Sequence, residues 1–86
     1  MPYIRREDRV RFDDKIHILQ GLIQSPGHLN YIITKIVMMY LIENGLSYIT
    51  INDVMGVLTC VQQELYRRVA IPYEDEKIAT NGDVYE

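Results

Sequence analysis

Residues 26–43 carry apolar side chains on two opposite sides of one predicted helix, and this feature constrains the fold most. The main apolar stripe repeats at helical spacing and consists of Leu29, Ile33, Ile36, Val37 and Tyr40. At about 100 degrees per residue, Tyr31, Met38 and Ile42 point nearly opposite to this stripe. A helix that is apolar on two sides needs neighbours on both, so we expect it to contact another subunit.

The chain offers few other ways to stabilise itself. It has 86 residues, and a domain of this size buries only about 60 to 65 per cent of its unfolded surface. Cys60 is the only cysteine, so no disulfide can form within one chain, and a lone thiol is typical of a reducing compartment. We therefore predict an all-α bundle of three helices, two of them long, that is completed by homo-oligomerisation through the second and third helices.

The first two helices are predicted from periodicity and capping residues. Phe12, Ile16, Leu19 and Ile23 recur at spacings of four, three and four residues, which predicts a helix that ends near Gln24. Ser25 and Pro26 then have the form of an N-cap and a first helical residue. This second helix is predicted to end at Asn44-Gly45, a favoured left-handed stop.

The third helix is predicted to begin at Thr50, which forms a weak capping box with Asp53. Its buried stripe consists of Val54, Leu58, Val61, Leu65 and Val69. Pro72 should end the helix, because the residue before a proline avoids the helical region. We therefore predict a single helical domain over residues 1–72 and an acidic C-terminal tail over residues 73–86, which is loosely ordered or lies against a neighbouring subunit.

The charge distribution argues against several classes of partner. The net charge is -3; residues 73–86 hold five acidic residues and one lysine, and residues 1–15 hold five basic residues interspersed with four acidic ones. Such a chain lacks the broad positive face that polymeric nucleic acid requires. No apolar run reaches the roughly 18 residues of a membrane span, and no export signal is apparent, so we expect a cytoplasmic protein that does not bind membranes.

Few residues are arranged in a way that would support catalysis or metal binding. No cysteine or carboxylate lies at zinc-site spacing from His17 or His28. Cys60 has no neighbouring base and is expected to be a buried thiol. Phosphate-binding glycine loops and nucleophile motifs are absent. We therefore expect no catalytic residue, no metal and no cofactor.

Two adjacent arginines, Arg67 and Arg68, precede Pro72, and two interpretations of them are open. Both could stabilise the helix C-terminus and pair with acidic residues among Glu74, Asp75 and Glu76. Alternatively, at least one of them binds phosphate or carboxylate through its planar guanidinium. The chain also has seven tyrosines but one phenylalanine and no tryptophan, and tyrosines such as Tyr66 could stack on a base or simply pack at helix interfaces.

Two resemblances to known families add to these interpretations. With "MPYI", "LNYIIT", "YRRVAIPYED" and "NGDVY", nearly the whole chain resembles a small uncharacterised family of bacteria and their phages. In addition, Arg67, Val69 and Pro72 reproduce an Arg-x-Val-x-x-Pro pattern that is similar to the end of the last long helix in bacteriophage anti-CBASS sponges. Those proteins are all-helical hexamers that sequester cyclic oligonucleotide immune signals between subunits. The second resemblance covers about the last third of the chain and assigns a ligand role to Arg67 alone.

These observations lead to two functional expectations. The first is a non-catalytic oligomer that sequesters a small anionic nucleotide-derived signal, such as a cyclic oligonucleotide. We expect its ligand to be bound by Arg67, Arg68, Tyr31, Lys35, Tyr66 and Tyr73. Of these, Tyr31 and Lys35 are included by residue type. The alternative is a structural or regulatory module that binds another protein through Tyr31, Met38 and Ile42.

Overall fold

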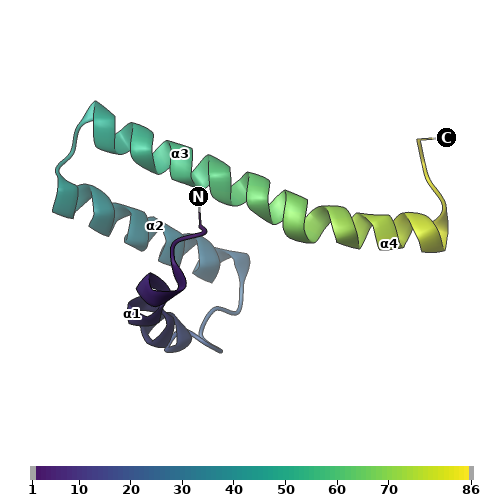
Figure 1. The fold of residues 1–86 in the computed structure, drawn as a ribbon, viewed down its shortest axis with the longest axis horizontal. Helices are drawn as coiled ribbons and strands as arrows, with labels where there is room; N and C mark the ends of the chain where they lie inside the picture. The colour runs from purple at the N-terminus through teal and green to yellow at the C-terminus, as the bar shows by residue number, and fades with distance from the viewer. Residues whose placement is uncertain (1, 86) are drawn as a thin grey trace. The chain divides into compact units, whose positions relative to one another are not determined.

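The computed structural model describes residues 2–85, and these contain helices but no strand. The helices are α1 (Arg6–His17), α2 (Pro26–Asn44), α3 (Tyr48–Leu65) and α4 (Ile71–Asn81), with a π-helical segment, Tyr66–Ala70, between α3 and α4 (Figure 1). The predicted all-α class is therefore confirmed. The chain divides into two compact units, Met1–Val54 and Met55–Glu86.

The first helix is shorter than predicted, because α1 ends at His17 rather than near Gln24. Residues 18–22 form turns, in which the N–H of Leu22 donates to the carbonyl of Leu19 at 3.0 Å. Gly21 has a φ of 81°, a left-handed conformation that glycine adopts at little cost but that cannot continue a right-handed helix. The apolar periodicity thus extends past the point where the backbone leaves the helix.

Both predicted ends of α2 are confirmed. Ser25 is the N-cap, and its Oγ accepts a hydrogen bond from the N–H of His28 at 3.1 Å, while Pro26 occupies the first turn. The helix ends at Asn44, and Gly45 follows with a φ of 85°. These local signals are sufficient to define the helix.

The start of α3 differs from the prediction, because the helix begins at Tyr48 and Thr50 already lies in its first turn. Ser47 and Thr50 make reciprocal bonds: Ser47 Oγ accepts from the N–H of Thr50 at 3.2 Å, and Thr50 Oγ1 accepts from the N–H of Ser47 at 3.0 Å. This is a capping box one turn earlier than predicted, with threonine in the position usually held by glutamate or glutamine.

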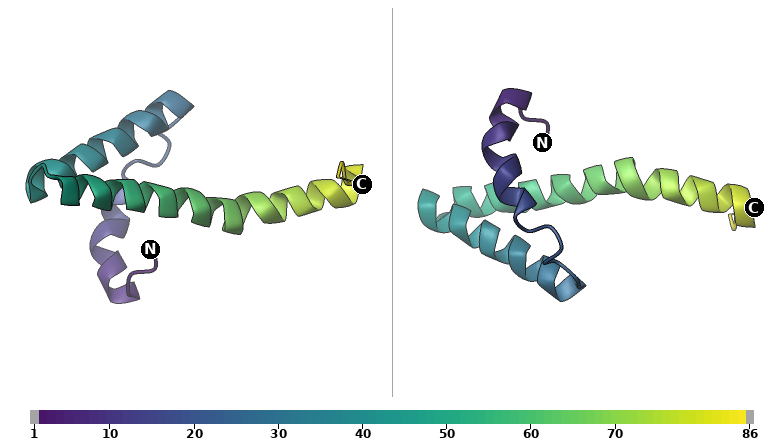
Figure 2. Two further views of the ribbon diagram at one scale, coloured as in Figure 1. Left: turned by 90° about the horizontal axis from the view of Figure 1, so that it is seen from above. Right: turned by 90° about the horizontal axis from the view of Figure 1, so that it is seen from below.

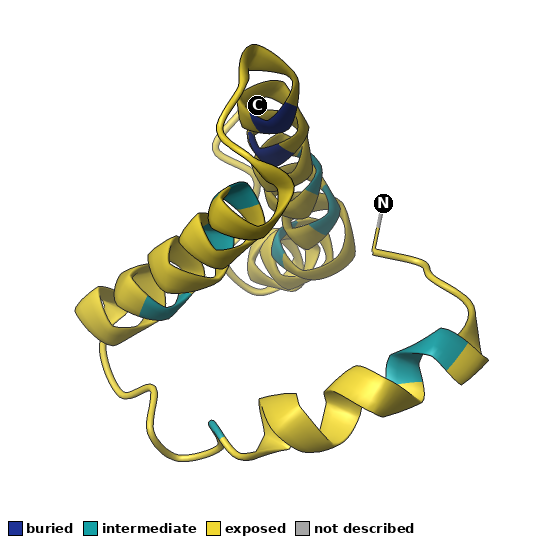
Figure 3. Ribbon diagram, turned by 90° about the vertical axis from the view of Figure 1, so that its left-hand side faces the viewer, coloured by how far each residue is buried: buried dark blue, intermediate teal, exposed yellow. Residues whose placement is uncertain are grey.

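The core of the first unit lies at the beginning of α3, where Figure 3 marks the two buried residues, Thr50 and Val54. Thr50 Oγ1 donates to the carbonyl of Gly45 at 2.7 Å, which ties the α2–α3 connection to α3. The hydroxyl of Tyr40 donates to Asp53 Oδ2 at 3.4 Å and joins the two helices. The hydrogen bonds that join α2 to α3 in the first unit therefore lie at and near the connection between these two helices.

The helical path does not end at Pro72 as predicted. From residue 55 to residue 81 it runs through the π-helical segment into α4, and Figure 2 shows it from two further sides as an unbroken series of turns. A proline ring inside an α-helix conflicts with the carbonyl four residues earlier, here that of Arg68. The π turn adds one residue to the local spacing, and Pro72 then occupies a tolerated first-turn position of α4.

Neither unit buries a core of ordinary size. No residue of the second unit between 55 and 85 is buried. In the first unit, Thr50 and Val54 are the only buried residues among those that the structure describes.

Within residues 2–85, no helix has both the length and the apolar character that are needed to cross a membrane.

Candidate functional site

An open hollow of about 420 Å³ lies at the end of α3 in the second unit, and we call it the polar hollow because each side chain that lines it carries a polar group. Its lining residues recur at helical spacing along one side of the chain. They are Thr59, Gln62, Gln63, Tyr66 and Arg67. The hollow therefore combines an aromatic ring and a guanidinium with two side-chain amides and a hydroxyl.

Arg67 is held in position by Glu64. Its Nη2 donates to Glu64 Oε2 at 2.9 Å, and the two side chains are 59 % and 21 % exposed. A guanidinium carries five N–H donors, so pairing with one carboxylate is compatible with simultaneous contact to a phosphate. Glu64 was missed as a partner, although its position three residues before Arg67 is the spacing at which helical side chains meet.

The other predicted ligand residues lie in separate places. In α2, Lys35 Nζ lies 5.8 Å from the centroid of the Tyr31 ring, and in α4, Lys77 Nζ lies 5.3 Å from that of Tyr73. Both are cation–π pairs at a spacing of four residues. The structure thus groups Tyr66 with Arg67 in the second unit and Tyr31 with Lys35 in the first. Arg68 belongs to the π-helical segment but does not line the polar hollow.

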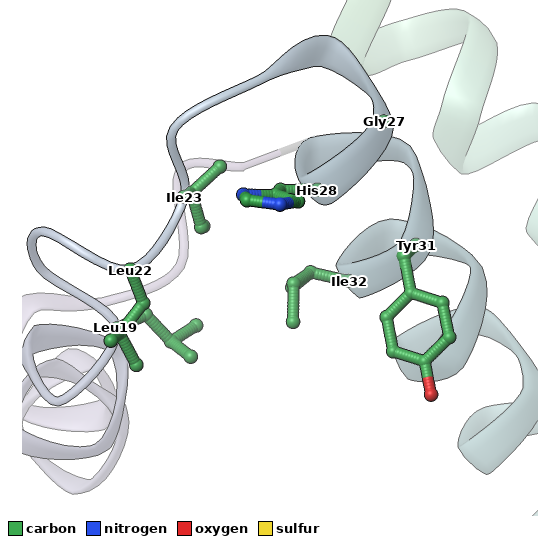
Figure 4. Close-up of a pocket in the computed structure, with 7 residues that line it drawn as sticks. All are labelled: Leu19, Leu22, Ile23, Gly27, His28, Tyr31 and Ile32. Carbon is green, nitrogen blue, oxygen red and sulfur yellow. The ribbon is translucent and has the colours of Figure 1, made fainter.

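A second concave surface lies in the first unit, between the α1–α2 connection and the first turns of α2 (Figure 4). This apolar groove has a volume of about 400 Å³ and is lined by Leu19, Leu22, Ile23, Gly27, His28, Tyr31 and Ile32. His28 is oriented by a hydrogen bond of 3.2 Å, in which its Nδ1 accepts from the N–H of Gln24. The groove was not predicted, because it depends on the turns that follow α1.

The described residues form no metal-binding cluster. Between residues 2 and 85, no three His, Cys, Asp or Glu side chains gather in an arrangement that could hold a metal ion. Cys60 is a half-buried free thiol rather than a fully buried one.

Comparison with known proteins gives one match. No curated protein and no solved structure matches the chain. A protein-family model matches residues 1–84, nearly the whole sequence. The expectation of an uncharacterised family is thereby confirmed: the chain belongs to the family described as Domain of unknown function (DUF6899).

Proposed function

We propose that this protein is a non-catalytic oligomer that captures a small anionic, nucleotide-derived molecule between its subunits, in the manner of a phage anti-defence sponge. The observation that carries the proposal is the polar hollow, where Tyr66 and Arg67 lie beside two amide side chains. An arginine suits a phosphate, a tyrosine ring suits the face of a base, and glutamine amides suit a base edge.

The polar hollow offers only one wall of such a site. All its lining residues come from the end of α3 and the π-helical segment, whereas small-molecule sites usually enclose most of their ligand. A second subunit would supply the opposite wall. Tyr31 with Lys35, and Tyr73 with Lys77, each combine an aromatic ring with a cation that could serve there.

The exposed apolar side chains support an oligomer. Within residues 2–85, every α-helix carries large apolar side chains that are exposed. Obligate interfaces are rich in such side chains and bury about 2,000 to 5,000 Å² in total. A closed assembly would cover this surface and complete the sites together.

The proposal is tested by ligand-induced thermal stabilisation with a panel of cyclic dinucleotides and trinucleotides. We expect at least one to stabilise the parent protein and Arg67→Ala to bind it about 10- to 150-fold more weakly, which corresponds to a lost charge-assisted hydrogen bond of about 1.5 to 3 kcal/mol. Lys15→Ala removes the same charge from α1 and should leave binding unchanged. Equal loss in both variants would contradict a site at Arg67.

A second candidate function is protein docking on α2. Tyr31, Met38 and Ile42 are all exposed, and Ile42 is 74 % exposed. This surface would suit an apolar partner helix. If it is the functional site, Met38→Asp abolishes partner binding and no nucleotide of the panel stabilises the protein.

A further inference from the structure

We propose that Arg9 is the centre of a second binding site, which takes a small monocarboxylate with a flat, apolar body. The site is an open hollow of about 380 Å³ that residues 2–4 form with α1, and we call it the N-terminal hollow. All the described residues that line it belong to the first unit. The proposal therefore goes beyond the proposed function, and it requires neither the polar hollow nor an oligomer.

The N-terminal hollow is lined mostly by apolar side chains. Tyr3 and Phe12 supply aromatic rings, and Ile4 and Ile16 supply aliphatic groups. Tyr3 is 53 % and Phe12 43 % exposed, so a ligand can still cover much of both residues. The guanidinium carbon of Arg11 lies 4.8 Å from the centroid of the Phe12 ring, a cation–π contact that restrains this ring. A flat apolar group suits such a lining, because aromatic rings pack well against one another.

Arg9 brings a positioned positive charge to this apolar lining. It is half-buried, and its Nε donates to the carbonyl of Ile4 at 2.8 Å. Within residues 2–85, Arg9 has no ion pair and no other hydrogen bond. The N–H donors of its two terminal nitrogens can therefore bind a ligand. Their fork matches the two oxygens of a carboxylate, which accepts two parallel hydrogen bonds from a guanidinium.

The acidic residues of α1 leave this charge without a partner. Glu7 and Asp8 pair with Arg5 instead, at 3.5 and 3.2 Å. Asp13 lies four residues after Arg9, whereas the bond to Ile4 directs the guanidinium toward the residues before the helix. A half-buried arginine that lacks a counter-charge gains more from a bound anion than an arginine in open solvent does, because water screens it less.

Asp13 limits the charge of the ligand that fits. It is the one acidic residue among the described residues that line the N-terminal hollow, and Arg9 is the one basic residue. A single arginine balances a single negative charge. The Asp13 carboxylate would repel the further charge of a phosphate ester or a cyclic oligonucleotide. The N-terminal hollow thus suits a monocarboxylate, a different class of ligand from the one proposed for the polar hollow.

Phenylacetate and its neutral isostere phenylacetamide test this assignment in a titration followed by NMR chemical shifts. We expect the parent protein to bind phenylacetate about tenfold or more tightly than phenylacetamide, because only the carboxylate makes charge-assisted bonds to Arg9. Acetate, which lacks the ring, should bind more weakly than phenylacetate. Arg9→Gln should lose about tenfold or more in phenylacetate affinity. Arg6→Gln makes the same change in α1 outside the hollow and should bind like the parent.

Asp13→Asn separates a role in binding from a merely structural one. It removes the like charge from the lining, so phenylacetate should bind a few fold more tightly while phenylacetamide affinity stays constant. Asp14→Asn, which changes the neighbouring residue outside the lining, is the control and should change neither affinity. If Arg9 served only to hold Ile4, Arg9→Gln would weaken both ligands equally and Asp13→Asn would strengthen neither.

Three results would overturn the proposal. They are equal affinity of the parent protein for phenylacetate and phenylacetamide, equal loss in Arg9→Gln and Arg6→Gln, and no gain in Asp13→Asn. The measurement is independent of the proposed function, because it uses no nucleotide and every residue concerned lies in the first unit. A protein that fails the nucleotide panel but shows these carboxylate effects would retain this site and lose only the capture of nucleotides.

Discussion

At the scale of single residues, the most informative contact is the pair between Arg67 and Glu64. The carboxylate fixes the guanidinium at 2.9 Å and is itself mostly covered, with 21 % of its side chain exposed. The same carboxylate places a negative charge next to the proposed phosphate position. The two residues should therefore affect anion binding in opposite directions.

Glu64→Gln is expected to strengthen nucleotide binding by a few fold. The substitution removes a like charge near the ligand while keeping a side chain that can accept a hydrogen bond from Arg67. Isothermal titration calorimetry at low and high salt would measure this change, which should shrink as salt screens the charges. Glu43→Gln, an equal charge change in α2, is the control. Weaker binding in Glu64→Gln would show that the carboxylate positions Arg67 more than it repels the anion.

Thr50 is the residue whose polar contacts should matter most for stability. Thr50→Val keeps the shape but removes the hydroxyl that donates to Gly45 and accepts from Ser47. Because these groups are partly buried, we expect a loss of about 1 to 3 kcal/mol in the free energy of unfolding, measured with urea. Thr80→Val removes an exposed hydroxyl bond in α4 and should cost less than about 0.5 kcal/mol. Equal effects would contradict a special role for Thr50.

At the scale of helices, the π-helical segment between α3 and α4 determines which side chains share a face. One extra residue in this turn rotates the side chains of α4 about the helix axis relative to the apolar stripe of α3. Pro72 supplies a physical reason for the extra residue, because an unbroken α-helix would place its ring against the carbonyl of Arg68. The register of α4 is therefore coupled to a single proline.

Pro72→Ala is expected to convert residues 66–71 to α-helix and rotate α4 by about 100 degrees relative to α3. Helix content by circular dichroism should be retained, whereas self-association of the proposed oligomer, measured by sedimentation, should weaken because the side chains of α4 turn to a new direction relative to those of α3. Pro26→Ala, which changes a first-turn proline of α2, is the control and should leave association intact. Unchanged association in Pro72→Ala would indicate that α4 takes no part in the contacts between subunits.

The helices also show what the sequence can predict. The ends of α2 were predicted because Ser25, Pro26 and Gly45 act through local backbone chemistry. The end of α1 was missed because apolar periodicity continues into turns that the left-handed Gly21 requires. The predicted stop at Pro72 was wrong because a proline after a helix and a proline in the first turn of the next one look alike in sequence.

The candidate site was predicted only in part, for a similar reason. Tyr66 stood out by residue type, and Arg67 stood out by residue type and by resemblance. Gln62 and Gln63 carry no such signal and become part of the site only through the helical spacing that brings them to the polar hollow. The apolar groove depends on the turns after α1, which periodicity did not reveal.

At the scale of the whole molecule, the dominant fact is that large apolar side chains are exposed on every α-helix within residues 2–85. Thr50 and Val54 are the only buried residues in the described part of the chain, positions 2–85. Apolar surface is costly to leave in water at about 25 cal/mol per Å². In the proposed oligomer, association of several chains would cover these side chains and bring the one-walled sites together.

The most direct test of this account is native mass spectrometry of the protein after gentle purification, with and without added cyclic oligonucleotides. The account predicts a closed oligomer that retains or takes up the mass of a small nucleotide at each site, and Arg67→Ala should form the same oligomer without that added mass. A monomer at all concentrations, or an oligomer that binds no member of the nucleotide panel, would contradict the proposed capture of a ligand between subunits.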